Sequence, residues 1–256
     1  TTLAPADKKL YALRDVTATV DCIPLIASSI MSKKMAEGID ALVLDVKVGS
    51  GAFMKNIDDA RRLASTMIDI GTQMGKRVVA LLTDMNQPLG RTIGNALEVM
   101  EAVQMLRGEA PDDYTEVTLA LTGEMLMLAG KASDFASARV LMQRAMKSGA
   151  AEDKLREIVA AQGGEPAAIT DLSRLPRAKH LRAVKATHRG FVTAIDTEAL
   201  GLAAMALGAG RMSVSDRIDP AVGFVLEKKL GDAVDVGEPV LVIHSNNASM
   251  VDDVAM

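Results

Sequence analysis

Apolar residues follow two different periods along the first part of the chain. A run of strand length over 40–48 (DALVLDVKV) leads into the glycine-rich turn 49–53, and a helical pattern over 57–74 precedes a second apolar run over 77–82. Two strands joined by one helix form a βαβ unit with a right-handed crossover, which places both strands in a parallel sheet covered by helices. The pattern therefore predicts the α/β class with a mostly parallel sheet.

Two helices are expected before this unit and four after it. The first begins near residue 4 and ends near Arg14, and the second covers 23–37, with Asp21 as its expected N-cap. The helices after the strands are expected to pack on the parallel sheet, and they cover 93–106, 114–128, 135–147 and 151–162.

The pattern changes after a stretch rich in turn-forming residues over 163–177, which we expect to be a domain boundary. Beyond it the chain predicts a compact α+β unit with alternating segments at 182–186 and 191–195, a helix over 197–207, and strands near 223–226 and 240–244. The segment 231–244 resembles the turn-and-strand pattern of lipoyl-like hammerhead folds. No lysine stands at the hairpin tip expected for that fold, which argues against a swinging-arm carrier.

Composition excludes several classes of function. The 256 residues are 49% hydrophobic and 24% charged with a net charge of -4, which gives no sign of nucleic-acid or membrane binding. Aromatic residues make up 2%, so base-stacking platforms are not expected. With no apolar run of membrane length and no signal sequence, we expect a cytoplasmic protein. The single Cys22 rules out an internal disulfide and is expected to be buried and unreactive.

Three polar residues of the leading helices form the first candidate site. Ser29 and Lys33 are four residues apart and share a helical face, and a short interhelical loop would bring Arg14 beside them. Their donors and acceptor suit an imide edge such as that of uracil or thymine. Ordinary solvated surface also explains these residues, and pattern alone favours that simpler interpretation.

Two further segments have both a functional and a structural interpretation. The turn 49–53 (GSGAF) follows a strand as phosphate-binding loops do, although an ordinary turn explains it equally well. The segment 87–102 (QPLGRTIGNALEVMEA) offers turn carbonyls and Glu101 to a group-one or group-two cation, and is also a plain helix N-terminus. The three histidines, at 180, 188 and 244, have no metal-ligand spacing and are expected to be structural or exposed.

Three ordered motifs resemble the thymidine and pyrimidine-nucleoside phosphorylase family: LAPADKKLYALRDVTATVDCIPLIASSIMSKKMAEG, DALVLDVKVGSGAFMK and LLTDMNQPLGRTIGNALEV. The resemblance returns in GFVTAIDTEALGLAAMALGAGR and GDAVDVGEPVLVIH, and so covers essentially the whole chain. It implies a homodimeric enzyme that cleaves a pyrimidine (deoxy)nucleoside with inorganic phosphate, releasing the base and a sugar 1-phosphate. We expect thymidine as the substrate, with thymine and 2-deoxyribose 1-phosphate as products. No organic cofactor is implied.

The resemblance assigns the base-binding role to Arg14 of the YALRD match and to Ser29 and Lys33 of the SSIMSKK match, with Arg14 and Lys33 as catalytic residues. Four apolar or aromatic residues fall at positions of the pocket wall: Tyr11, Val20, Ile26 and Phe53.

The resemblance also implies a potassium site, formed by the main-chain oxygens of Leu89 and Thr92 and the carboxylate of Glu101. Family members carry an upstream Lys-His-Ser-Thr-Gly-Gly pattern that binds phosphate, and this sequence does not contain it. We therefore expect the natural polypeptide to begin further upstream and this chain alone to be inactive. The expected domains are a remnant of a small α domain (1–38), a central α/β domain (39–165) and a C-terminal α+β domain (178–256).

Other functions remain open at this point. They are a broader pyrimidine-nucleoside phosphorylase, a superfamily relative such as an AMP phosphorylase or an anthranilate-type phosphoribosyltransferase, and a folded fragment without catalytic activity. The imide-binding trio favours a pyrimidine substrate.

Overall fold

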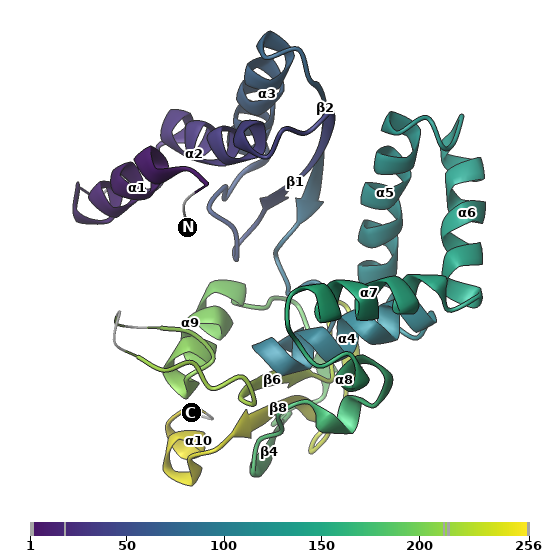
Figure 1. Cartoon of the computed structure of the whole chain (residues 1–256). Coiled ribbons are helices and arrows are strands. Elements are labelled where there is room, and N and C mark those ends of the chain that lie inside the picture. Colours follow the sequence, from purple (N-terminus) through teal and green to yellow (C-terminus); the bar gives the residue numbers. More distant parts are fainter. Residues whose placement is uncertain (1–2, 18, 212, 214–215, 255–256) are drawn as a thin grey trace. The chain divides into compact units, whose positions relative to one another are not determined.

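The computed structural model describes residues 3–17, 19–211, 213 and 216–254 (Figure 1). The chain forms two compact units, one containing 1–85 and 118–140 and the other containing 86–117 and 141–256. Helices α5 (Asp112–Leu128) and α6 (Phe135–Lys147) each begin in one unit and end in the other. These two units are defined by their internal packing. They do not test the three domains expected from the sequence, which remain a prediction.

The first unit is built on a two-stranded parallel sheet. Strands β1 (Ala41–Val48) and β2 (Arg77–Asp84) pair in register along their whole length, and helix α3 (Ile57–Gln73) makes the crossover between them. Asn56 caps α3 by accepting a hydrogen bond from the amide of Asp59. Helices α1 (Pro5–Thr17) and α2 (Ile23–Ala36) come first in the chain, and α2 packs against α3 (Figure 1).

One hydrophobic core holds the sheet and helices of this unit together. Leu44 and Val46 are two positions apart on β1, so they point to the same face of the sheet. They share a core with Met31 of α2 and Met67 of α3, and all four side chains are buried. The predicted βαβ unit is confirmed.

The second unit is built on a four-stranded sheet in the order β3-β6-β8-β4, with every neighbouring pair antiparallel. Its strands are β3 (Thr92–Ile93), β4 (His180–Lys185), β6 (Gly223–Leu226) and β8 (Pro239–Ser245). Phe224 and Ile243 pair across β6 and β8, and both are fully buried. Strands β5 (Gly190–Phe191) and β7 (Ala233–Val234) form a separate antiparallel pair.

Helices complete the second unit. α4 (Asn95–Arg107) packs on β3 and β6, and α9 (Thr197–Leu207) packs on β6. α7 (Ala150–Ala161) contacts α4 and the short α8 (Ala167–Thr170), which leads into a 3₁₀ turn at Leu172–Arg174. The last helix, α10 (Ala248–Val254), contacts β8.

The sheet prediction is wrong in one respect. Over the described residues the parallel sheet has two strands and the larger sheet is antiparallel. Helix α4, expected on the parallel sheet, lies instead on β3 and β6. The cause is β3, whose two residues pair with the C-terminal β6 and are too few to produce a visible period in the sequence.

Several local predictions also need correction. The first helix continues past Arg14 to Thr17, and the N-cap position of α2 is Cys22, not Asp21. Cys22 is exposed, contrary to the buried position expected for it, because it lies at the end of the interhelical loop. In the segment 191–195 only Phe191 belongs to a strand. Among the described residues, no helix has both the length and the apolar character needed to cross a membrane.

Two glycines allow the β3 segment to approach β6. A Cβ on Gly223 would lie 1.9 Å from the carbonyl oxygen of Ile93, and one on Gly94 would lie 2.4 Å from that of Val222. Both glycines also have positive φ angles, of 152° and 134° respectively. No other residue fits either position without moving the backbone.

We predict that Gly223→Ala destabilises the chain by about 1–3 kcal/mol more than Gly231→Ala, because only the first substitution adds a steric clash. Gly231 is a matched control, since its φ is also positive (90°) but nothing lies within 4 Å of an added Cβ. Urea unfolding measures both. Equal decreases in the free energy of unfolding would show that the positive φ angle alone, without the clash, makes glycine necessary at position 223.

Candidate functional site

The loop between α1 and α2 is closed around Arg14. The guanidinium donates to the carbonyls of Thr19 (3.4 Å), Leu25 (3.3 Å) and Val20, and it lies 5.2 Å from the centre of the Tyr11 ring. Arg14 is buried, at 6% exposure. It therefore ties two loop carbonyls and the carbonyl of Leu25, in the first turn of α2, to the end of α1, and three of its five N–H donors are used in doing so.

Lys33 and Ser29 meet as their spacing on α2 predicts. The Lys33 ammonium donates to Ser29 Oγ at 2.9 Å and to Asp7 Oδ2 at 2.7 Å, which joins α2 to the first turn of α1. Ser29 is buried, whereas the Lys33 side chain keeps 39% of its exposure. An ammonium has three donors, so these two bonds leave one for a ligand.

Asp7 is the residue that sequence reasoning missed. The hydrogen bond from Lys33 is the main cause that lowers the pKa of its carboxyl, with further lowering from Ser29 and from the charges of Lys33 and Arg14, while burial acts in the opposite direction. The charges of both predicted catalytic residues thus act on one carboxylate. The signal in the sequence was an acidic residue in the first helical turn, which the helix dipole already explains.

The predicted pocket-wall residues have different environments. Val20 is half-buried and gives its carbonyl to Arg14, and Ile26 packs against the core of the first unit. Tyr11 is 44% exposed beside Arg14. Phe53, in the turn after β1, is the most exposed of the four at 65%.

The glycine-rich turn after β1 is held by its own backbone. The amides of Gly49, Gly51 and Ala52 donate to the carbonyls of Met54, Met85 and Gly49 respectively. Helix α3 begins only at Ile57, behind its own cap at Asn56. These amides are engaged within the protein, which favours the ordinary turn over the phosphate cradle.

A polar cluster on the parallel sheet was also not anticipated. Lys47 bonds Asp45 Oδ2 at 2.7 Å and Thr83 Oγ1 at 2.9 Å, and Thr83 donates to the other oxygen of Asp45. These residues lie toward the carboxyl ends of β1 and β2, where α/β proteins commonly bind ligands. The alternation of polar and apolar residues over 44–48 was the available signal.

The first unit also has a cavity of about 620 Å³, lined by Arg77, Met125, Leu128 and the residues of 39–43. It lies at the amino ends of β1 and β2, away from the carboxyl ends. None of the predicted base-binding residues lines it. Arg77 already donates to the carbonyl of Leu128 at 2.6 Å, and we assign no ligand to this cavity.

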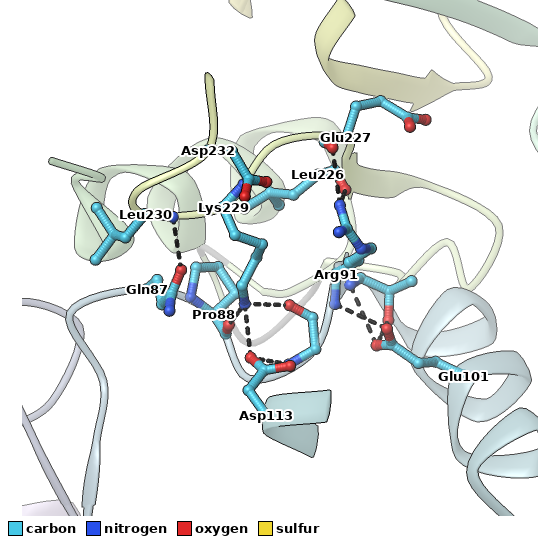
Figure 2. A network of polar contacts seen from close by, with 12 residues as sticks. Gln87, Pro88, Arg91, Glu101, Asp113, Leu226, Glu227, Lys229, Leu230 and Asp232 are labelled. Atoms are coloured by element: carbon cyan, nitrogen blue, oxygen red, sulfur yellow. Dashed lines mark hydrogen bonds and ion pairs between the residues drawn. The ribbon is translucent and has the colours of Figure 1, made fainter. Parts of the chain in front are cut away.

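The predicted cation segment belongs to the second unit. Glu101 of α4 is 5% exposed and accepts hydrogen bonds from the amides of Arg91 (2.7 Å) and Thr92 (3.2 Å) and from Thr92 Oγ1 (2.6 Å). Figure 2 shows Arg91 between Glu101 and the carbonyls of Leu226 and Glu227, to which its guanidinium donates. In the part of the chain described, no cationic side chain pairs with Glu101.

Of the predicted ligands, the Glu101 carboxylate is the one whose surroundings suit a monovalent cation. A buried carboxylate with only neutral donors keeps its negative charge uncompensated, and carboxylate and carbonyl oxygens are the ligands that group-one ions prefer. No group of three or more His, Cys, Asp and Glu residues suited to a transition metal exists among the described residues. His180 and His188 are exposed, and burial lowers the pKa of His244.

Comparison with known proteins gives matches in both parts of the chain. Residues 1–152 match the family described as glycosyl transferase family, a/b domain, and residues 191–256 match the one described as pyrimidine nucleoside phosphorylase C-terminal domain. The chain is 54% identical over 252 residues to the pyrimidine-nucleoside phosphorylases of Geobacillus stearothermophilus and Staphylococcus aureus (strain NCTC 8325 / PS 47). Each alignment covers 98% of this chain and 58% of the relative, so the chain spans somewhat over half of their length.

We predict that Asp7→Asn lowers the free energy of unfolding at pH 7 by about 0.5–1 kcal/mol, the usual value of a partly exposed ion pair. Because the folded pKa of Asp7 lies below the ordinary 3.8, its contribution is present above that pH and is lost as the pH falls further. The difference in free energy of unfolding between the parent and Asp7→Asn should therefore become smaller below about pH 4, as measured by urea unfolding. Asp21→Asn, at an exposed carboxylate in the interhelical loop, is the control. A gap that stays constant down to pH 3 contradicts the assignment.

Proposed function

Because the chain belongs to the pyrimidine-nucleoside phosphorylase family, we propose that it supplies the base-binding part of an enzyme that cleaves pyrimidine nucleosides with inorganic phosphate. Thymidine is the substrate we propose, with thymine and 2-deoxyribose 1-phosphate as products. A wider range that includes uridine is the alternative. The relatives are described only as pyrimidine-nucleoside phosphorylases.

The observation that carries the proposal is the Lys33 ammonium. Ser29 and Asp7 hold it in one position, at 2.9 and 2.7 Å, and it remains partly exposed with a donor to spare. A positive charge fixed in this way can meet a carbonyl oxygen of the pyrimidine without being reorganised when the reaction occurs. Ser29, buried beside it, would orient the ring.

Arg14 has a second role in the proposal. Three of its N–H donors hold the interhelical loop, which leaves two for the base. Its planar group is fixed by the loop carbonyls and by Tyr11, so little side-chain freedom is lost when it binds a ligand. The loop and the base site would therefore be ordered by one residue.

The chemistry follows from these charges. A phosphate oxygen attacks C1′ of the sugar as the bond from C1′ to N1 of the base breaks, and the electron pair of that bond leaves with the base. Arg14 and Lys33 bind the resulting base anion more strongly than the neutral nucleoside. Interactions that strengthen toward the transition state lower the barrier.

A potassium ion is proposed at the other predicted site. The main-chain oxygens of Leu89 and Thr92 and the carboxylate of Glu101 would hold it, and the ion would supply the positive charge that Glu101 lacks. Its contribution is to the stability of the loop that carries these residues.

A homodimer is part of the proposal. Leu10 and Leu13 of α1 are 59% and 55% exposed, and apolar side chains gathered on one helix are typical of a surface that another subunit covers.

We predict that Arg14→Ala and Lys33→Ala each lower kcat/KM for thymidine by about 2–4 kcal/mol of transition-state stabilisation, or roughly 30- to 1,000-fold. The assay uses a hybrid in which this chain replaces the matching region of the Geobacillus stearothermophilus relative. Lys34→Ala is the matched control, because the neighbouring Lys34 is as exposed as Lys33 (38% against 39% of the side chain) but pairs only with Glu37 among the described residues. It should stay within about threefold of the parent hybrid.

Three outcomes would overturn parts of this proposal. An inactive parent hybrid, beside an active Geobacillus enzyme, would favour a folded chain without catalytic function. Arg14→Ala and Lys33→Ala variants as active as Lys34→Ala would remove the base-binding assignment. Comparable kcat/KM values for uridine and thymidine in the parent hybrid would replace thymidine specificity with the broader one.

We predict that potassium chloride raises the thermal midpoint of the chain relative to tetramethylammonium chloride at equal ionic strength. A ligand that binds only the folded state stabilises it by about 2.7 kcal/mol at 100 times its Kd. Glu101→Gln should abolish the increment, whereas Glu98→Gln, at an exposed position one turn earlier on α4, should preserve it. Equal responses in both variants would place any ion elsewhere.

A further inference from the structure

A continuous seam joins residues 87–96 to residues 220–230 within the second unit. At its centre β3 pairs with β6, aligning Thr92 with Val225 and Ile93 with Phe224. On one side the amide of Ala96 donates to the carbonyl of Pro220, and on the other the amide of Leu230 donates to Gln87 Oε1 at 3.0 Å. The seam connects the segment that matches the a/b domain to the one that matches the C-terminal domain.

Lys229 lies at the Gln87 end of this seam. Its residue is 9% exposed, and its ammonium donates to the carbonyl oxygens of Pro88 and Gly90 and bonds Asp113 Oδ2 at 2.9 Å. Figure 2 shows the side chain pointing toward Pro88 and Asp113. Three acceptors meet the three donors of an ammonium, so the buried charge is fully satisfied.

The surroundings of Lys229 are fixed from several directions. Its own amide donates to Asp232 at 2.8 Å, and Asp113 also accepts from the amide of Gly90 at 3.2 Å. Gly90 has a φ of 68°, and an added Cβ would lie 2.6 Å from the Glu101 carboxylate. The loop 88–90 thus has the ammonium on one side and a carboxylate on the other.

Asp113 is ionised in this arrangement. Burial acts to raise its pKa, but the hydrogen bond and charge of Lys229, with the amides of Tyr114 and Gly90, lower the pKa below its ordinary value. The ammonium therefore faces one negative charge and two carbonyl dipoles.

The geometry points to Lys229 as a tethered cation, which occupies a site of three oxygens that a monovalent ion would otherwise fill. Main-chain carbonyls and one carboxylate are the ligands that proteins offer to group-one ions. Here the ion is covalently attached to the C-terminal segment, and it fixes the loop that contains Leu89. Removing the side chain should leave an empty site that accepts a free cation of similar size.

The two neighbouring cationic side chains, Arg91 and Lys228, bind other groups. Arg91 is committed to the carbonyls of Leu226 and Glu227, at 3.2 and 2.8 Å. Lys228 donates to the carbonyl of Ala233 and pairs with Glu238, both within the C-terminal segment. Among the described residues, Lys229 alone brings a cationic group to Pro88 and Gly90.

The experiment compares Lys229→Ala with Lys229→Met in the full chain. Each variant should lose roughly 4–12 °C in thermal midpoint, because two buried carbonyls lose a charged donor and the half-buried Asp113 carboxylate loses its ion-pair partner. Ammonium or potassium chloride should restore at least half of the loss in Lys229→Ala, relative to tetramethylammonium chloride at equal ionic strength. Lys229→Met should not recover, since its side chain fills the space without a charge.

Two double variants identify the site. Asp113→Asn combined with Lys229→Ala should abolish the recovery. Glu101→Gln combined with Lys229→Ala should retain it, which separates this site from the proposed potassium site and makes the result independent of phosphorolysis. Equal salt responses of Lys229→Ala and Lys229→Met, or a Lys229→Ala midpoint within about 2 °C of the parent, would overturn the inference.

Refolding covers the case in which Lys229→Ala does not fold in cells. The variant is diluted from urea into ammonium chloride or tetramethylammonium chloride, and the recovery of native circular dichroism is measured. Recovery in ammonium alone supports the tethered cation. Equal recovery, or equal failure, in both salts contradicts it.

Discussion

A charge removed from water must be matched by oxygen atoms, and the second unit is organised around one such charge. Lys229 is buried, and its ammonium finds Pro88, Gly90 and Asp113 on the opposite side of the seam. A buried ion is costly unless every donor is paired, so the loop and the C-terminal segment hold each other in one arrangement. The pairing of β3 with β6 extends the same seam toward α4.

The first unit also matches cationic side chains with oxygen atoms, but it does not use all of their donors. Lys33 pairs with Asp7 and Ser29 but stays partly exposed, so one donor remains available to a ligand. Arg14 satisfies the carbonyls of the interhelical loop and keeps donors in reserve. A cation whose donors are all used supports structure, whereas one with a donor to spare can bind a substrate.

The proposed cation site at Glu101 and the site of Lys229 both border Gly90, and they differ in how the carboxylate is compensated. Glu101 has amide and hydroxyl donors but no cationic partner among the described residues, while Asp113 has Lys229. The protein thus compensates the half-buried Asp113 carboxylate with its own Lys229, and in our proposal it leaves the buried Glu101 carboxylate to an external ion. Both carboxylates accept hydrogen bonds from amides of the same loop, 88–92, so both help to fix its shape.

The sequence by itself determined the elements with a strong period. The βαβ unit, the long helices and the meeting of Ser29 with Lys33 are local consequences of apolar spacing and of helix geometry. Only the tertiary structure decided the rest. Asp7 reaches Lys33 across 26 residues, and Lys229 reaches Pro88 across 141. The strand β3 exists only because β6 pairs with it. Contacts of this kind depend on how distant segments pack, and no periodicity along the chain encodes them.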